Sequence, residues 1–409
     1  MAKNKDLCVH YDRCGGCSIQ EVPYSEQLEN KKNNLLEIFR ENEIEVENFE
    51  EILASPDIYE YRNNMEFSFG DLKKGGKLQL GMHPRGRRYD VITVDQCLLV
   101  DQDFRDILST IINYCRNKEF KKYHIKLREG FLRNLVIRKG INTGEVVANL
   151  ITTSQLDHDF SPLTEKLKAL DLKGELVGFV QTINDDFSDQ VSCDEMKIYH
   201  GRNHFYDQLL NNKFKIDSLS FFQTNTKGAE LLYSEAEKYI SSAKNKVVYD
   251  LYCGAGTISQ SIAADAAKIY GIEIDQEAAE RAAENAKLNE VQNTEYISGD
   301  VLEKINEINQ RPDLLIIDPP RPGINPKALT KIAAVDAAEI LYISCNPKSL
   351  ARDLKELEDQ NYQLQKFKAV DKGNISAVER SLIIMDFDSY RLFFSSEYSN
   401  GVAVTIFPT

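Results

Sequence analysis

The sequence predicts an α/β fold in which a mostly parallel, doubly wound, Rossmann-like sheet follows a strand-rich central domain that carries a cysteine cluster. Three observations lead to this prediction. Three cysteines stand close together near the N-terminus, at positions 8, 14 and 17. Short runs of alternating polar and apolar residues, typical of half-buried strands, fill the region from about residue 55 to 200. Beyond it, four apolar runs are each followed by a turn and a helix-like stretch, which favours a parallel sheet: VVYDLY, KIYGIEID, DLLIIDPP and EILYISCN.

Length and composition narrow the class of protein. At 409 residues and 42% hydrophobic content, the chain can bury more than one core, which predicts two or three domains. It has no apolar run of about 18 residues, and its polar start, MAKNKDLCVHYDRCGG, has no signal-peptide core. We therefore expect a soluble, cytoplasmic protein without membrane contact, and a monomer by default. The net charge of −14 lowers the expectation of a nucleic-acid partner without excluding it, because phosphates respond to local patches.

Three regions follow from the pattern. Residues 1–50 form a cysteine-cluster segment and a helix, Tyr24 to Glu41, whose apolar side chains recur at helical spacing. Residues 51–200 form the strand-rich central domain, in which LRNLVIRKG and GEVVANLIT are joined by a short turn as a hairpin. Residues 201–409 form the parallel-sheet domain, although the tail from Tyr390 fits no element of the pattern.

A glycine-rich turn follows the first strand of the predicted parallel sheet. Cys253-Gly254-Ala255-Gly256-Thr257 lies between VVYDLY and a helix, and glycines there let the backbone approach a ligand at the helix N-terminus. The next strand ends at Glu273, about 20 residues on, where a carboxylate binds ribose hydroxyls. Asp275 is more often a helix N-cap. Because G-x-G-x-x-G is absent, S-adenosylmethionine fits better than NAD; the alternative is a turn that only changes the chain direction.

A cysteine ends the strand EILYIS at the carboxyl edge of the sheet, where open α/β folds keep their ligands. Asp318 ends the preceding strand, so we expect its carboxylate, Glu273 and the Cys345 thiol to face one crevice. A thiolate can add to C6 of uracil, which makes C5 able to attack a methyl sulfonium. The alternative is a buried cysteine that acts as a small apolar residue.

The motif that begins at Asp318 separates the possible base chemistries. Enzymes that methylate exocyclic amines usually follow the Pro-Pro pair with an aromatic residue, and this chain has Arg321 there. RNA cytosine C5-methyltransferases carry a cysteine directly after Asp-x-Pro, where this chain has Pro320 or Arg321. Uracil C5 is therefore the favoured target.

Together, these motifs resemble those of the iron-sulfur RNA 5-methyluridine methyltransferases, especially the ribosomal RNA branch. The resemblance covers roughly residues 8 to 387 and implies a class I S-adenosylmethionine methyltransferase domain. Its elements are Cys8-x5-Cys14-x2-Cys17 with Cys97 later, YRNNMEFSFG, SFFQTNT, DLYCGAGT, GIEID, IIDPPRPG and ISCNP.

The resemblance also implies roles for single residues. Cys345 is the nucleophile, and Glu379 is the proton acceptor that removes the C5 proton before the thiolate leaves. The S-adenosylmethionine site is lined by Gln223, Tyr252, Glu273 and Asp318. The segment before Glu379 departs from the family pattern Asp-x-Phe-Pro-x-Thr-x-His-x-Glu. Asp371 and Ser376 are in register, whereas the Phe, Pro and His positions hold Gly373, Asn374 and Val378, and Glu379 lies one position before the place of the pattern's Glu.

The N-terminal cysteines form a compact loop that suits a metal, and thiolates in the cytosol suggest either zinc or iron-sulfur. The resemblance implies a 4Fe-4S cluster held by Cys8, Cys14, Cys17 and Cys97, with a structural or RNA-positioning role. We assign the remaining cysteines, Cys115, Cys193 and Cys253, to packing. The six histidines are scattered without metal-type pairing.

Basic residues of the central domain are the expected RNA contacts. For each one, a solvated surface charge is the alternative. The set comprises Arg85, Arg87, Arg88, Lys121, Lys122, Lys126, Arg128, Arg133, Arg138 and Lys139.

The predicted function is transfer of a methyl group from S-adenosylmethionine to C5 of a uridine in structured RNA, with 23S ribosomal RNA favoured. Methylation of the T-loop of transfer RNA is the first alternative. A second is an RNA-binding or assembly factor that keeps the fold with weakened catalysis, suggested by the altered segment before Glu379. A third is an iron-sulfur redox sensor.

Overall fold

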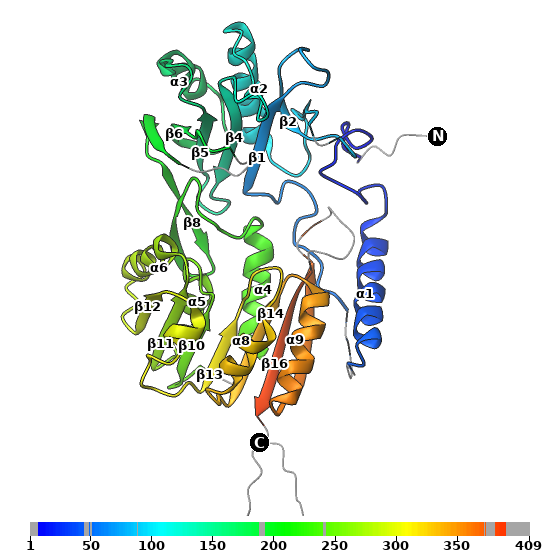
Figure 1. Cartoon of the computed structure of the whole chain (residues 1–409), viewed down its shortest axis with the longest axis vertical. Helices are drawn as coiled ribbons and strands as arrows, with labels where there is room; N and C mark the ends of the chain where they lie inside the picture. The colour runs from blue at the N-terminus through cyan, green and yellow to red at the C-terminus, as the bar shows by residue number, and fades with distance from the viewer. Residues whose placement is uncertain are drawn as a thin grey trace, which may run out of the picture.

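The computed structural model describes residues 7–44, 49, 51–87, 89–187, 193–239, 243–371, 373 and 381–389. Two seven-stranded sheets dominate this part of the chain, and a two-stranded hairpin, β8 and β9, connects them in sequence. Figure 1 shows the central sheet above the C-terminal sheet, with helix α1 beside the latter. In the described residues no helix is both long and apolar enough to cross a membrane.

The central sheet has the strand order β3-β2-β1-β4-β5-β6-β7. Its neighbours pair antiparallel except β5 and β6, and β4 and β5 form the predicted hairpin. Helices α2 and α3 share one buried apolar cluster with this sheet. The elements are β1 Asn64–Gly70, β2 Gln79–Met82, β3 Ile92–Thr93, α2 Gln102–Asn117, β4 Leu132–Lys139, β5 Glu145–Thr152, α3 Ser161–Lys168, β6 Glu175–Ile183 and β7 Glu195–Gly201.

The C-terminal sheet has the order β12-β11-β10-β13-β14-β16-β15. Strands β10 to β14 pair in parallel, and β16 pairs antiparallel with both β14 and β15, so the sheet is mostly parallel, as predicted. The strands and preceding hairpin are β8 His204–Leu209, β9 Asn212–Asp217, β10 Val247–Leu251, β11 Lys268–Glu273, β12 Thr294–Ser298, β13 Leu314–Ile317, β14 Glu339–Ser344, β15 Tyr362–Asp371 and β16 Ser381–Ser389. The helices are α4 Thr226–Tyr239, α5 Thr257–Ile262, α6 Gln276–Leu288, α7 Val301–Lys304, α8 Pro326–Ala333 and α9 Pro347–Asp359.

Both faces of the parallel sheet are buried, which explains why its strands read as continuous apolar runs. In β13, Leu315 and Ile317 pack into one cluster with residues of α8 and α9. Leu314 and Ile316 point to the opposite face and pack with α4 and α5. The sheet is therefore doubly wound, as the alternation of strands and helices predicted.

The winding direction reverses between β10 and β13. The chain passes from β10 outward to β11 and β12, and then returns to the other side of β10. In open α/β sheets, ligands bind outside the carboxyl ends of the strands at such a reversal. The carboxyl ends of β10, β11, β13 and β14 meet at this edge because their registers are parallel.

Helix α1, Tyr24–Glu41, belongs to the core of the C-terminal sheet although it precedes the central domain in sequence. Its buried Leu35, Ile38 and Phe39 join the same apolar cluster as Leu350 and Leu354 of α9. Figure 1 shows α1 and α9 side by side. The first helix therefore completes one layer of a domain whose strands lie more than 200 residues further along the chain.

Candidate active site

The glycine-rich turn after β10 folds back over the neighbouring strand. The amides of Tyr252 and Cys253 donate to the carbonyl oxygen of Ile272, at 2.9 and 3.2 Å. Tyr252, Gly254 and Gly256 all have positive φ, of 65°, 53° and 73°. A Cβ at Gly256 would lie 2.6 Å from the Tyr296 hydroxyl, so only glycine fits there. This turn leads directly into the start of α5, at the edge where the sequence predicts a nucleoside.

Glu273, at the end of β11, is held by the backbone around it. The Gly254 amide donates to Oε2 and the Asp275 amide donates to Oε1, each at 3.0 Å. These two backbone donors hold the carboxylate at the edge of the turn. The predicted contact with ribose hydroxyls requires this position. Asp275 accepts from the amides of Glu277 and Ala278 and caps α6, which confirms the N-cap prediction.

Gln223 and Asp318 meet at a tyrosine that sequence reasoning missed. The Tyr233 hydroxyl of α4 is fully buried and lies 3.1 Å from Thr257 Oγ1. Burial raises the pKa of Tyr233, the negative charge of Asp318 raises it further, and hydrogen bonds to Thr257 and Gln223 lower it. Since all three act on one hydroxyl, two predicted cofactor residues that lie 95 positions apart are close in space. An apolar helical pattern around Tyr233 in the sequence hid this role.

Asp250, inside β10, is a second residue that the sequence did not single out. One carboxylate oxygen accepts from the Ser259 amide and hydroxyl, at 3.1 and 2.6 Å, and the side chain is fully buried. Burial raises the pKa of Asp250 to about 7, with a smaller contribution from Asp318 and Glu273. Asp250 therefore lies beneath the glycine-rich turn and joins β10 to α5.

Tyr252 lies between two further acidic residues. Burial raises its pKa to about 12, and the nearby Asp300 and Asp353 contribute. Asp300 follows β12, is exposed, and accepts from the Leu302 amide at 2.8 Å. It extends the row of strand-end acids that includes Glu273 and Asp318. The pair Gly299-Asp300 directly after the strand TEYIS was the signal that the sequence interpretation did not use.

Cys345 follows β14 directly and is half-buried beside the cluster beneath α4. Its loop is tied to the loop after β13: the Asn346 side-chain amide and the Ser349 hydroxyl both donate to the Arg321 carbonyl oxygen, at 3.1 and 3.3 Å. Asn346 also accepts from the Lys348 amide and caps α9. The loops that carry Asp318 and Cys345 are therefore fixed to each other at one sheet edge.

The predicted proton acceptor, Glu379, lies outside the described residues. The start of its segment is described at Asp371, whose buried carboxylate accepts from Lys31 Nζ at 2.5 Å and from the Tyr24 hydroxyl at 2.8 Å. Gly373 has φ +130°, and a Cβ there would lie 2.4 Å from the Tyr61 ring. The departure from the family pattern at Gly373 is therefore matched by an aromatic side chain that takes up the adjoining space.

The four predicted cluster cysteines come from two segments, the N-terminal loop with Cys8, Cys14 and Cys17 and the residue Cys97 after β3. They influence one another electrostatically. Burial raises the pKa of Cys17 to about 12, with contributions from Cys97, Cys14 and Cys8. Burial also raises the pKa of Cys97 to about 11, and Cys8 and Cys14 contribute again. As placed, however, no three Cys, His, Asp or Glu side chains of the described residues form a group that could hold a metal ion. The mutual influence of the four cysteines fits a shared set of ligands. Their side chains, however, are not arranged around one point as metal ligands are.

Two other sequence assignments require correction. Cys115 and Cys253 are buried, as predicted, whereas Cys193 is exposed and does not pack in a core. Arg133, Arg138 and Lys139 are buried and bonded to protein groups, so they are not surface contacts for phosphates. Arg138 donates to the Asp217 carbonyl, and Lys139 forms an ion pair with Asp103.

The family described as tRNA (Uracil-5-)-methyltransferase matches residues 23–377. The chain belongs to this family. It is accordingly an S-adenosylmethionine-dependent RNA (uracil-C5-)-methyltransferase, as predicted from Cys345 and the motifs around it.

Individual relatives agree with the family assignment. An uncharacterized RNA methyltransferase of Clostridium tetani is 51% identical over 89% of this chain and 80% of its own length. Another, from Caldanaerobacter subterraneus, is 43% identical over 89% of this chain and 81% of its own. Among solved structures, the Pyrococcus abyssi tRNA (uracil-54, C5)-methyltransferase in complex with S-adenosyl-L-homocysteine has a TM-score of 0.74 and 25% identity, covering 95% of this chain and 88% of that one.

Proposed function

We propose that the enzyme methylates C5 of a specific uridine in structured RNA through a covalent bond between Cys345 and C6, with 23S ribosomal RNA as the favoured substrate. The observation that carries this proposal is the position of Cys345 at the carboxyl end of β14, tied through Asn346 and Ser349 to the loop of Asp318. A half-buried thiol at that edge can meet both a base and a cofactor.

The proposed reaction proceeds in three steps. The Cys345 thiolate bonds to C6, and the electrons of the C5–C6 double bond move onto the C4 carbonyl oxygen as an enolate. C5 then takes the methyl group from the sulfonium, which leaves S-adenosylhomocysteine. Glu379 removes the proton from C5, the C5–C6 double bond re-forms, and Cys345 leaves as a thiolate.

The cofactor site is proposed to consist of Gln223, Tyr252, Glu273 and Asp318. Glu273 accepts hydrogen bonds from the ribose hydroxyls, since its two carboxylate oxygens are already oriented by the Gly254 and Asp275 amides. Asp318 and Gln223 lie next to the Tyr233 hydroxyl on the other side of the turn. The backbone of Tyr252 supports the same turn.

The identity of the RNA is a separate part of the proposal. The ribosomal assignment is supported by the order and spacing of Cys8, Cys14, Cys17 and Cys97 in the chain. We propose that they hold a 4Fe-4S cluster. Transfer RNA is the alternative, because a protein of similar fold is named as a tRNA (uracil-54, C5)-methyltransferase.

The decisive experiment supplies the enzyme with deuterated-methyl S-adenosylmethionine and, separately, unmodified 23S RNA fragments and bulk transfer RNA. Mass spectrometry of the nucleosides should show labelled 5-methyluridine in the 23S pool, and none with Cys345→Ala. Label only in transfer RNA would establish the alternative substrate. No label in either pool from the parent protein, together with unchanged RNA binding by Cys345→Ala, would instead identify a binding factor.

A further inference from the structure

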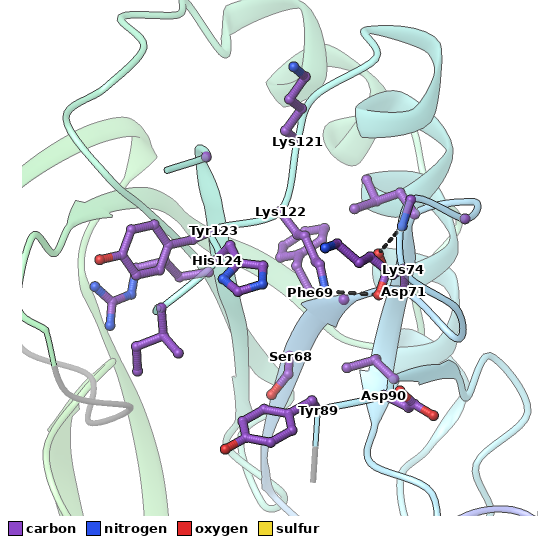
Figure 2. Close-up of a pocket in the computed structure, with 18 of the residues that line it drawn as sticks. Ser68, Phe69, Asp71, Lys74, Tyr89, Asp90, Lys121, Lys122, Tyr123 and His124 are labelled. Carbon is purple, nitrogen blue, oxygen red and sulfur yellow. Dashed lines mark hydrogen bonds and ion pairs between the residues drawn. The ribbon is translucent and has the colours of Figure 1, made fainter. Parts of the chain in front are cut away.

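A cavity of about 1690 Å³ opens in the central domain, in a part of the fold that the proposed reaction does not use. Three segments line it: residues 66–78 from β1 and the loop after it, residues 83–87 with 89–91, and residues 116–134 from the end of α2 to β4. Figure 2 shows Lys121, Lys122 and Tyr123 on one side of this space and Tyr89 on another. The cavity is therefore built from segments that are distant in sequence.

Its lining is more positive than the protein as a whole. Eight Lys and Arg residues and five Asp and Glu residues line the cavity, although the chain carries a net charge of −14. Two of these acids are neutralised by cations, since Asp71 pairs with Lys122 at 2.8 Å and Asp90 pairs with Arg87 at 3.2 Å. This local excess of cations favours a polyanion.

Three exposed lysines supply most of that excess: Lys74, Lys121 and Lys126. Across the described ranges, none of them forms an ion pair with a carboxylate. Glu66, another lining acid, accepts a hydrogen bond from the Asn134 side-chain amide at 2.9 Å, and burial raises its pKa. These lysines can bind phosphate groups while the ion pairs of Asp71 and Asp90 stay intact.

Aromatic side chains stand beside these cations. The Tyr89 side chain is 63% exposed, and Lys126 Nζ lies 5.2 Å from the centre of its ring. The Arg133 guanidinium lies 4.8 Å from the Tyr123 ring and donates to the Asn184 and Asp186 carbonyls, so it is held in place behind that ring. Rings flanked by cations stack on unpaired bases while the cations meet the backbone, which favours single-stranded over duplex RNA.

The segment that carries Tyr123 is rigid. The Tyr123 amide donates to the Leu132 carbonyl at 2.7 Å, and the Phe131 amide donates to the Lys121 carbonyl at 3.0 Å. Gly130 closes this loop at φ +117°, where a Cβ would lie 2.0 Å from the Lys122 carbonyl oxygen. The backbone that carries Tyr123 is therefore already ordered, which lowers the entropic cost of binding.

Strand β1 connects this cavity to the segment that carries Gln223. Just before its start, the Asn63 side chain donates to the Gln223 carbonyl and to Thr226, at 2.7 and 2.9 Å. Further along the same strand, Glu66, Ser68, Phe69 and Gly70 line the cavity. One short strand therefore joins the cavity to the side of the protein where the cofactor site is proposed.

We propose that this cavity binds a single-stranded segment of the RNA substrate that is distinct from the target uridine. Lys74, Lys121 and Lys126 contact phosphates, and Tyr89 and Tyr123 stack on bases. The inference rests on the proposed function for the identity of the partner as substrate RNA. It adds a second contact that sets which uridine reaches Cys345.

The test uses the full-length enzyme and a short, unstructured, fluorescently labelled RNA. Fluorescence anisotropy should show binding weakened ~5- to 150-fold by Tyr89→Ala and by Tyr123→Ala, as expected for loss of one stacked base. Tyr89→Phe keeps the ring and should bind like the parent protein. Lys126→Ala should reduce the salt dependence of binding by about one counterion, whereas Lys166→Ala, an exposed lysine of α3 outside the cavity, should not.

Kinetics on the methylated RNA pool separate this inference from the proposed function. The cavity variants should raise KM and leave kcat unchanged, because they remove binding that is equal in ground and transition states. If every cavity variant binds RNA like the parent protein, has the same KM and still methylates, the cavity assignment is wrong and the proposed function stands.

Tighter binding of a duplex or of an acidic peptide than of the single strand would also overturn the cavity assignment. RNA binding through the cavity without methyl transfer would instead contradict the proposed function. If Tyr123→Ala fails to fold, Lys121→Ala tests the same segment, because the Lys121 side chain is exposed.

Discussion

Lys31 and Asp371 form a buried ion pair across 340 positions of sequence, with Nζ and Oδ1 2.5 Å apart and side chains 1% and 0% exposed. The Tyr24 hydroxyl donates to the other oxygen of Asp371 at 2.8 Å. Helix α1 therefore holds the end of β15, from which the chain continues toward Glu379.

Replacing Lys31 with methionine should leave the Asp371 charge buried without its cation. Loss of one partner of a buried pair costs about 3–5 kcal/mol, so we expect the free energy of unfolding to fall by an amount of this order. Urea denaturation followed by circular dichroism measures it. Lys32→Met is the matched control, because Lys32 is the next residue in α1 and is only partly buried. Equal losses in the two variants would show that the ion pair contributes nothing specific.

Asp250 should make stability depend on pH. Because burial raises its pKa to about 7, the folded chain keeps this proton at pH values where the unfolded chain has lost it. Its contribution therefore makes the free energy of unfolding fall as pH rises from about 4 to 7, by up to about 1.4 kcal/mol per pH unit. Asp250→Asn keeps an acceptor for Ser259 and removes this titration. Urea titrations across that range should give a shallower fall for the variant, and parallel curves would refute the assignment.

Glu379→Gln should trap the enzyme on its RNA. Without a base to remove the C5 proton, the thiolate of Cys345 cannot leave, and the methylated base stays bonded to the protein. Denaturing gel electrophoresis with labelled RNA should show a complex that survives heating in detergent. The double variant Cys345→Ala with Glu379→Gln is the control and should show none. Free 5-methyluridine formed by Glu379→Gln at the parent rate would exclude Glu379 as the proton acceptor.

Alanine at Gly256 should destabilise the fold more than alanine at Gly254. Both glycines have positive φ, which costs a non-glycine residue about 1–3 kcal/mol. Only at Gly256 would the new Cβ also meet the Tyr296 hydroxyl, at 2.6 Å, whereas nothing lies within 4 Å of a Cβ at Gly254. Thermal denaturation of the two variants without cofactor compares these costs directly. A larger loss for Gly254→Ala would show that the contact with Tyr296 is easily relieved.

Cys97→Ala should lower the iron and acid-labile sulfide bound per chain after anaerobic reconstitution. The proposed cluster needs four thiolates, and Cys97 is the ligand from outside the N-terminal loop. Colorimetric assays of iron and sulfide measure the effect. Cys193→Ala, which removes an exposed cysteine, is the control and should match the parent protein. Equal metal content in both variants would remove Cys97 from the ligand set.

The sequence predicted those features that depend on local order along the chain. Strand-end residues such as Glu273, Asp318 and Cys345 could be placed because parallel strands bring their carboxyl ends to one edge. Asp275 could be assigned as a cap because its partners lie within three residues. Residues with distant partners could not be predicted. Arg138 looked like a surface cation until the fold placed it against Asp217 and Ser220, about 80 positions away.

The place of α1 in the C-terminal core has a consequence for how the protein is made. The ribosome completes α1 about 300 residues before α9, against which it packs. At ~5–20 residues per second, the apolar face of Leu35 and Phe39 waits roughly 15–60 s for its partner. The contact between α1 and α9 therefore forms late in synthesis, and it joins an early segment of the chain to a late one.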